Sequence, residues 1–418
     1  MKKIILNNLP YIVENNNYST ITFDLVYPYK YDKNHMFDNK LFKQIVMNSS
    51  FDYKTEREFK IEQAKKLIIN FSCRIARYHN NLFIVFSLTV PDPKKVKIAN
   101  FEEAFNFFFR TIYYPNIKDE AFDVEQFERE KKYIKFNIQN SIRKIYNYSY
   151  QRFIQFADDI GDLKNNRLNN IDLIEKSNPK DLYSYYKEVI IDNQPILLVY
   201  GDVDKEQIQK IYNEYFRKNE NKIVINKDYD CYMKLSEDPN IIEESSNYNQ
   251  SALYMCYKVK NMSENDKMYL RAVCDILNNG STNLVFKKLR TENNLIYSHK
   301  FARHIKNGMF YIEAYIEKNN KEKTINEIKS LMSEIKNEKL IEECIEKIVN
   351  GIQYRLIELE DSKYYKFDKY IDDLFEFNIS VEQMLEFYQK IDIGELKKFM
   401  DRIKLDTIYF LRGEKNEG

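Results

Sequence analysis

Glycine and proline are scarce in this sequence, at 8 residues each among 418. Loops that hold nucleotide phosphates need closely spaced glycines, because only a backbone without bulky side chains can approach the phosphate oxygens. Neither a GxGxxG nor a GxxxxGK string is present. These absences argue against nucleotide-dependent chemistry.

Long apolar runs are also missing. No segment reaches the ~18 consecutive apolar residues expected of a membrane-spanning helix. Near the N-terminus, Asn7 and Asn8 cut the apolar run to four residues, too short for the core of a signal peptide. The 5 cysteines form no CxxC pair and are typical of buried thiols in a reducing compartment. We therefore expect a cytoplasmic protein without a membrane span.

Neither sign of charge dominates the composition. The chain has 65 Lys and Arg against 64 Asp and Glu, a balance that argues against a nucleic-acid partner. Hydrophobic residues make up 44% of the chain, enough for sizeable cores. At about 100–200 residues per domain, the length predicts two to three domains.

A pattern of hairpin, helix and strand occurs twice along the chain. Residues 71–90 and 297–316 alternate apolar and polar residues on both sides of a polar turn, which predicts a β-hairpin in each half. Each half closes on a compact apolar strand, at 196–204 and at 407–415. Between hairpin and closing strand, apolar residues recur at helical spacing: Phe127, Ile134, Ile138, Ile142 and Ile145 in the first half, and Ile341, Ile345, Ile348 and Ile352 in the second.

The matched order of these elements favours an internal repeat over a chance likeness between two unrelated segments. It predicts an α+β protein of two tandem homologous domains, each an antiparallel-rich sheet with long helices packed on one face. We expect an N-terminal domain over residues 1–216, a polar and weakly periodic linker over 217–248, and a C-terminal domain over 249–418.

Residues 276–301 read ILNNGSTNLVFKKLRTENNLIYSHKF. This segment resembles the small–Ser–x–Leu–x–x–x–Leu–Arg–Glu–x–x–Leu–x–Tyr–Ser stretch of the insulinase/pitrilysin-type zinc peptidases, which include the mitochondrial processing peptidase. The matching residues are Gly280, Ser281, Leu284, Leu289, Arg290, Leu295, Tyr297 and Ser298. The resemblance extends over essentially the whole chain and implies a half-size family member built of two homologous domains.

The resemblance also implies where a zinc site would stand. Active members carry HxxEH on a helix, where two histidines one turn apart bind zinc and the glutamate deprotonates the metal-bound water. Here Leu41 and Ile45 take the histidine positions, and Gln44 takes the place of the base. The family's third ligand follows seven residues after a glutamate on the long helix, and counting from Glu130 gives Asn137. Hydrocarbons and neutral amides do not suit zinc chemistry, so we expect no metal and no peptidase activity in this chain alone.

Histidine is too rare to rebuild such a site elsewhere. The 4 histidines are His35, His79, His299 and His304, and no HxxEH or HExxH string exists. His299 and His304 lie five residues apart on a predicted strand, so they should face opposite sides. One hypothesis is an active metalloenzyme with unrecognised ligands such as His35; the simpler interpretation of His35 is a lone surface histidine.

Half-size members of the family can divide their roles between two chains, one with HxxEH and zinc and the other with an Arg–Tyr pair. Arg290 and Tyr297 match that pair. The resemblance therefore implies a non-catalytic, substrate-binding subunit of a heterodimeric zinc endopeptidase. A guanidinium and a phenol would hold the oxyanion and the neighbouring carbonyl of a peptide. The implied partners are an HxxEH-bearing subunit, in which zinc is expected, and a peptide substrate, with small processed peptides as one candidate class.

Without the resemblance, the same two residues favour a structural interpretation. An arginine near a helix C-terminus commonly interacts with the helix dipole, and a tyrosine in an apolar strand is commonly a core residue. The alternative function is therefore a peptide-binding or scaffold protein of the same fold without a role in proteolysis. The glycine-rich loop of the metal-free mitochondrial subunit is not visible here, so bacterial pairs are the closer analogue.

Overall fold

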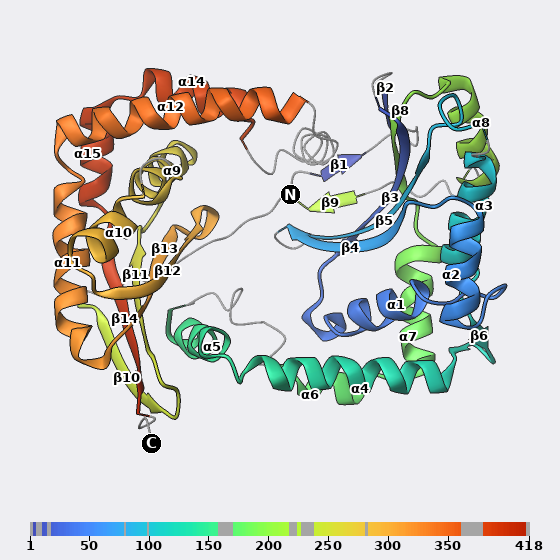
Figure 1. Cartoon of the computed structure of the whole chain (residues 1–418), viewed down its shortest axis with the longest axis horizontal. Coiled ribbons are helices and arrows are strands. Elements are labelled where there is room, and N and C mark those ends of the chain that lie inside the picture. The colour runs from blue at the N-terminus through green and yellow to red at the C-terminus, as the bar shows by residue number, and fades with distance from the viewer. Residues whose placement is uncertain are drawn as a thin grey trace. The chain divides into compact units, whose positions relative to one another are not determined.

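The computed structural model describes residues 3–5, 11–14, 18–78, 81–97, 100–157, 170–216, 224–226, 238–280, 283–360 and 379–414. The chain divides into two compact units (Figure 1). The first unit comprises the described residues within 1–139 and 170–229, and the second those within 140–169, 230–372 and 378–418. A piece of the N-terminal half of the sequence thus belongs to the second unit.

The first unit is built on a five-stranded sheet. Its strand order is β2 (Tyr11–Glu14), β8 (Ile196–Gly201), β3 (Thr20–Lys30), β5 (Asn81–Pro91) and β4 (Asn70–Tyr78). Only β2 and β8 run parallel; the other neighbours are antiparallel. Two small pairings complete the strands of this unit: β1 (Lys3–Ile5) with β9 (Val224–Asn226), and β6 (Ile117–Lys118) with β7 (Ala121–Phe122).

Helices cover one face of this first sheet. Phe23 of β3 packs its ring 5.1 Å from that of Phe105 and 5.9 Å from that of Phe101, which shows that the Phe23 side of the sheet meets α3. The helices of the unit are η1 (Lys33–His35), α1 (Asp38–Val46), α2 (Glu56–Lys65), α3 (Phe101–Tyr113), α4 (Val124–Ser141), α6 (Asp172–Lys176), α7 (Pro179–Tyr186), η2 (Lys187–Ile191) and α8 (Lys205–Phe216).

The second unit repeats the same sheet. Its strand order is β10 (Asn240–Ser246), β14 (Lys404–Gly413), β11 (Ser251–Lys258), β13 (Met309–Ile316) and β12 (Ile296–His304). The pair at the β10 edge is again parallel, and the remaining pairs are antiparallel. This correspondence, strand by strand, is the structural form of the repeat seen in the sequence.

Helices and the main core lie on one face of this sheet too. Leu253, Met255, Phe310 and Ile312 point into a continuous apolar cluster with the helices. The helices of this unit are α5 (Ile145–Ala157), α9 (Glu264–Asn278), α10 (Leu284–Phe286), η3 (Lys287–Glu292), η4 (Ile305–Asn307), η5 (Lys318–Asn320), α11 (Lys321–Glu334), α12 (Glu338–Glu360), α14 (Val381–Lys390) and α15 (Ile393–Asp401).

Helix α5 packs on the opposite face of the second sheet. The ring of Phe153 stacks on Tyr254 at 4.5 Å, and the hydroxyls of Ser149 and Tyr254 lie 2.8 Å apart. The guanidinium of Arg152 pairs with Glu244 of β10. Tyr254 alternates with the helix-facing Leu253 on β11, so α5 covers the face that the other helices leave.

The structure therefore confirms the α+β class, the repeated antiparallel-rich sheets and both hairpins. His79, in the predicted turn of the first hairpin, lies outside the described residues. The predicted helix through Ile145 is interrupted: α4 ends at Ser141, Ile142 is 41% exposed, and α5 begins at Ile145. The interval 217–248 also contains strands β9 and β10. The predicted domain boundaries remain a prediction.

Candidate functional site

The face of α1 that would carry a zinc site offers hydrocarbon. Leu41 and Ile45 are fully buried, and Gln44 is half-buried. The two apolar residues lie one helical turn apart on the side that packs into the first unit. Neither has a lone pair for a metal, so the residues of α1 do not fit zinc.

Helix α4 contacts the C-terminal end of α1 through an amide. Gln126 accepts a hydrogen bond from Ser49 Oγ at 2.9 Å and donates one of 3.4 Å to the carbonyl of Ile45. Asn137 is half-buried and lies eleven residues further along α4, a rise of about 16 Å. The structure thus brings Gln126, which the sequence reasoning missed, to Ile45. Counting along one helix could not find it, because the register between two helices depends on packing.

Glu130, the residue from which Asn137 was counted, has a hydrogen-bond partner. Glu130 is 9% exposed, and its Oε1 accepts from Arg129 Nε at 3.1 Å. In the described part of the chain, no three or more His, Cys, Asp and Glu side chains are grouped so that they could hold a metal ion.

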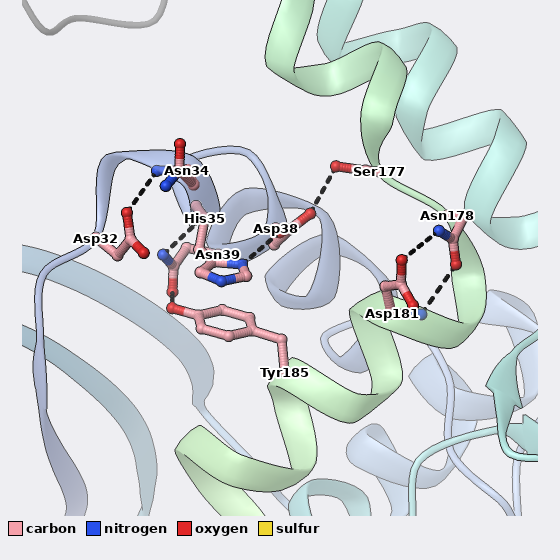
Figure 2. A network of polar contacts seen from close by, with 9 residues as sticks. All are labelled: Asp32, Asn34, His35, Asp38, Asn39, Ser177, Asn178, Asp181 and Tyr185. Atoms are coloured by element: carbon pink, nitrogen blue, oxygen red, sulfur yellow. Dashed lines mark hydrogen bonds and ion pairs between the residues drawn. The ribbon is translucent and has the colours of Figure 1, made fainter.

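His35 lies in a polar network at the N-terminal end of α1 (Figure 2). Its Nδ1 is 2.8 Å from Asp38 Oδ2, and its ring stacks on Tyr185 at 4.0 Å and 5°. Ser177 Oγ donates to Asp38 Oδ1 at 2.6 Å, so the carboxylate lies between serine and histidine. The hydrogen bond with Asp38 raises the pKa of His35, although burial opposes the shift.

This order of groups does not make a hydrolytic triad, in which the imidazole must lie between the hydroxyl and the carboxylate. Asn39 donates to the His35 carbonyl at 2.8 Å and accepts from the Tyr185 hydroxyl at 3.1 Å (Figure 2). The network therefore connects η1 and α1 to α7, through Ser177 just before that helix and Tyr185 near its C-terminal end, which is a structural role.

Arg290 and Tyr297 both lie near the start of edge strand β12. Asn283 caps α10 by accepting from the backbone N–H of Phe286 at 3.0 Å, and the chain continues directly into η3, a single π-helical turn that carries Arg290. Arg290 is exposed, and its Nη1 donates to the carbonyl of Ile296 at 2.6 Å. Tyr297 is 49% exposed, and its hydroxyl donates to Glu317. Both side chains are thus on the surface of the second unit, and the tyrosine is not a core residue.

Strand β12 ends its sheet, and no described strand pairs with its outer edge. The register is irregular between Ile296 and Ser298, so the bulge falls at Tyr297. Ser298 and Lys300 are exposed as well. An edge of this kind presents unpaired backbone N–H and C=O groups to which an extended peptide can add. His299 and His304 lie on opposite sides of the strand, as predicted: His299 Nε2 is 3.1 Å from Asn278 Oδ1 of α9, whereas His304 pairs in register with Met309 of the α5-side cluster.

Residues 176–352 match the family described as "Peptidase M16 inactive domain". The chain is 23% identical over 334 residues, 79% of its length, to the "Probable inactive metalloprotease YmfF" of Bacillus subtilis (strain 168), 78% of which is covered. Residues 176–352 are thus similar to the inactive domain of M16-type peptidases. The resemblance to the insulinase/pitrilysin-type peptidases is thereby confirmed, and the similarity is to a domain and a relative described as inactive.

Solved structures share the fold of this chain over its whole length. A conserved protein from Enterococcus faecalis V583 superposes with a TM-score of 0.83 at 16% identity, with 100% of both chains covered. The peptidase M16 inactive domain from Pseudomonas fluorescens gives 0.71 at 10% identity, with 99% of this chain and 98% of that chain covered. Among the described helices, none combines the length and apolar character needed to cross a bilayer.

Proposed function

We propose that this chain is the non-catalytic, substrate-binding subunit of a heterodimeric zinc endopeptidase. Its partner would be an HxxEH-bearing chain. That chain would hold the zinc ion, because the residues of α1 do not suit zinc binding. The substrate would be a peptide, with small processed peptides as the candidate class. One observation supports this proposal most directly. Helix α1 has no metal ligand at the positions matched to the zinc motif, and the same chain exposes Arg290 and Tyr297 beside the edge of β12 that pairs with no described strand.

The chemistry of Arg290 supports a contact with a peptide. A guanidinium has five N–H donors, and the described contacts engage one of them, with the Ile296 carbonyl. No carboxylate pairs with Arg290 in the part of the chain that the structure describes. The remaining donors can hold a peptide carbonyl or an oxyanion that develops at the partner's site. The Tyr297 hydroxyl can exchange Glu317 for the same substrate.

A reducing, cytoplasmic location is part of this proposal. The described cysteines Cys73, Cys256, Cys274 and Cys344 are buried thiols without a disulfide. Burial raises the pKa of the Cys73 thiol to about 12, which keeps it protonated and unreactive.

The proposal is tested by co-expression with an HxxEH-bearing chain encoded nearby. Cleavage of a fluorogenic peptide should require both chains. Arg290→Ala should lower kcat/KM by about 10²–10³, the usual cost of one oxyanion donor, and Tyr297→Phe should lower it by less. Arg355→Ala and Tyr354→Phe, at exposed positions of α12, are the matched controls and should leave the rate unchanged. Full activity of the HxxEH chain alone would contradict the proposal.

The alternative is a peptide-binding or scaffold protein without a role in proteolysis. The hydrogen bonds from Arg290 to the Ile296 carbonyl and from Tyr297 to Glu317 favour it, since both stabilise the start of β12. In that case Arg290→Ala lowers the melting temperature and leaves cleavage by any co-expressed HxxEH chain intact.

A further inference from the structure

A cluster of charged side chains lies between α9, β12 and α14 in the second unit. Asp275 of α9 accepts hydrogen bonds from Arg303 of β12 and, at 2.6 Å, from the hydroxyl of Tyr388 of α14. Arg271 lies one turn before Asp275 on α9 and is largely buried beside them. The cluster is separate from Arg290 and Tyr297, and the proposed function makes no use of it.

The guanidinium of Arg271 is poorly satisfied. Among the described residues, the hydrogen-bond contact found for its Nη1 is Met384 Sδ, at 3.3 Å, and its buried Nε has no hydrogen-bond partner there. A thioether is a weak acceptor for a cation. Burial, followed by repulsion from Arg303, lowers the pKa of Arg271. Native proteins rarely leave buried donors unpaired, so this one calls for an acceptor.

The charges of the cluster do not balance. Two guanidinium groups, of Arg271 and Arg303, share the carboxylate of Asp275. One further anion would neutralise the cluster and satisfy the open donors. A carboxylate suits this task because its oxygens accept two parallel N–H bonds from a guanidinium.

Arg303 lies on edge strand β12 and is the more accessible member of its pair with Asp275. Arg303 is 40% exposed, whereas Asp275 is 12% exposed. Arg303 points to the α9 side of the sheet, where it meets Asp275. A peptide strand added to β12 sends every second side chain to that same side. From Tyr297 to Arg303 is six residues, or about 20 Å along the strand.

We propose that Arg303 and Arg271 form a carboxylate-binding site for a peptide that lies along the edge of β12, with an acidic side chain or C-terminal carboxylate about six residues from the position beside Tyr297. This inference deepens the proposed function, on which it rests for the presence of a peptide, and adds that the peptide is selected for negative charge at one position.

The test uses the full chain alone and labelled peptides of about ten residues, measured by fluorescence anisotropy. One set carries a single Glu moved along the sequence, and the matched set carries Gln at the same positions. The wild-type chain should bind the best-placed Glu peptide about tenfold more tightly than its Gln counterpart, as expected for a charge-assisted hydrogen bond. This preference should weaken at high salt.

Variants locate the preference. Arg303→Gln, at a partly exposed position, should abolish the discrimination between Glu and Gln, because affinity for the Glu peptide falls to about that for the Gln peptide. Arg271→Gln should do the same, and its melting temperature is compared with wild type because Arg271 is largely buried. Arg355→Gln on α12 is the matched control and should retain full discrimination.

Three outcomes would overturn the inference in different ways. Equal binding of the Glu and Gln peptides removes the carboxylate site and leaves peptide binding intact. Discrimination that survives in Arg303→Gln places the site elsewhere. Failure to bind any peptide removes both this site and the substrate-binding part of the proposed function.

Discussion

The two units share one strand order but differ in what each sheet carries on its second face. In the first unit, that face of β3 holds Asp24, which pairs in register with Ser87. In the second, the paired residues are Tyr254 and Glu313, and α5 lies over them. Strand order follows from hairpins and alternating patterns, which both halves keep. The side chains on the second face differ although the strand order is the same.

Helices α1 and α9, one in each unit, also differ in the side chains that they bury. Helix α1 buries Leu41 and Ile45, whereas α9 places Arg271 and Asp275 against neighbouring elements. At the positions that the resemblance assigns to the zinc motif, α1 has hydrocarbon. The corresponding sheet of the second unit is instead covered by a helix that carries charged side chains.

The largest effect should come from a buried ion pair of the second unit. Lys258 and Asp406 lie 2.8 Å apart and are 1% and 5% exposed. Lys258→Met leaves the carboxylate buried without its partner and should cost about 3–5 kcal/mol of unfolding free energy. The double variant Lys258→Met/Asp406→Leu should recover most of that loss.

Urea denaturation followed by circular dichroism and tyrosine fluorescence measures this loss, since the chain has no tryptophan. Lys390→Met is the control: its pair with Glu386 is 73% and 65% exposed, and the change should cost under about 1 kcal/mol. Equal costs for the two variants would show that the second unit does not depend on its buried charges.

A pH-dependent effect should distinguish the second face of the first sheet. Burial raises the pKa of Asp24 to about 6, so the folded unit favours the protonated carboxyl. The stabilisation from this proton is complete below the unfolded pKa near 4 and is lost as the pH rises through about 6. Asp24→Asn removes the dependence and should gain about 3 kcal/mol on wild type between pH 4 and pH 7.

Two other carboxylates sharpen this measurement. Hydrogen bonds from Arg110 lower the pKa of Asp52, so its contribution is lost as the pH falls, and Asp52→Asn should shift stability in the opposite sense. Burial raises the pKa of Glu313 in the second unit, so Glu313→Gln should act in the same sense as Asp24→Asn. A flat difference for Asp24→Asn would mean that its carboxyl is hydrated.

The smallest effect should be the same in both units. Helix α2 begins with a capping box on Thr55 and α9 with one on Ser263. Thr55→Ala and Ser263→Ala should each cost about 1 kcal/mol. Ser184→Ala and Ser333→Ala remove exposed hydroxyls from within helices and should stay within about 0.5 kcal/mol. Thermal unfolding can resolve these changes, and a clear asymmetry between the two caps would indicate that one unit unfolds later than the other.

The parts of the fold that could be predicted are those set by local periodicity. The β4–β5 and β12–β13 hairpins are evident from alternation, and the helical spacing around Ile348 predicts α12. Arg290 and Tyr297 both lie near the start of β12, which also follows from their closeness in the sequence.

The remainder depends on tertiary packing. An arginine and an aspartate four residues apart on a helix, such as Arg271 and Asp275, normally indicate a solvated face, so their burial could not be foreseen. Gln126 was missed because spacing along α4 carries no information about where α1 crosses it. Strand β10 alternates weakly and is largely exposed, and its parallel partner lies far along the chain.

Helix α5 has a consequence for how this chain can be divided. A cut anywhere in the interval 217–248 would leave α5 on the N-terminal fragment, although its packing surface is Tyr254, Tyr311 and Tyr409 of the other. The C-terminal fragment would then expose the aromatic rings of these tyrosines, which are buried under α5 in the whole chain, to water. Fragments produced separately should therefore be poorly soluble. When mixed, they should associate, because α5 of the N-terminal fragment packs on the sheet of the C-terminal fragment.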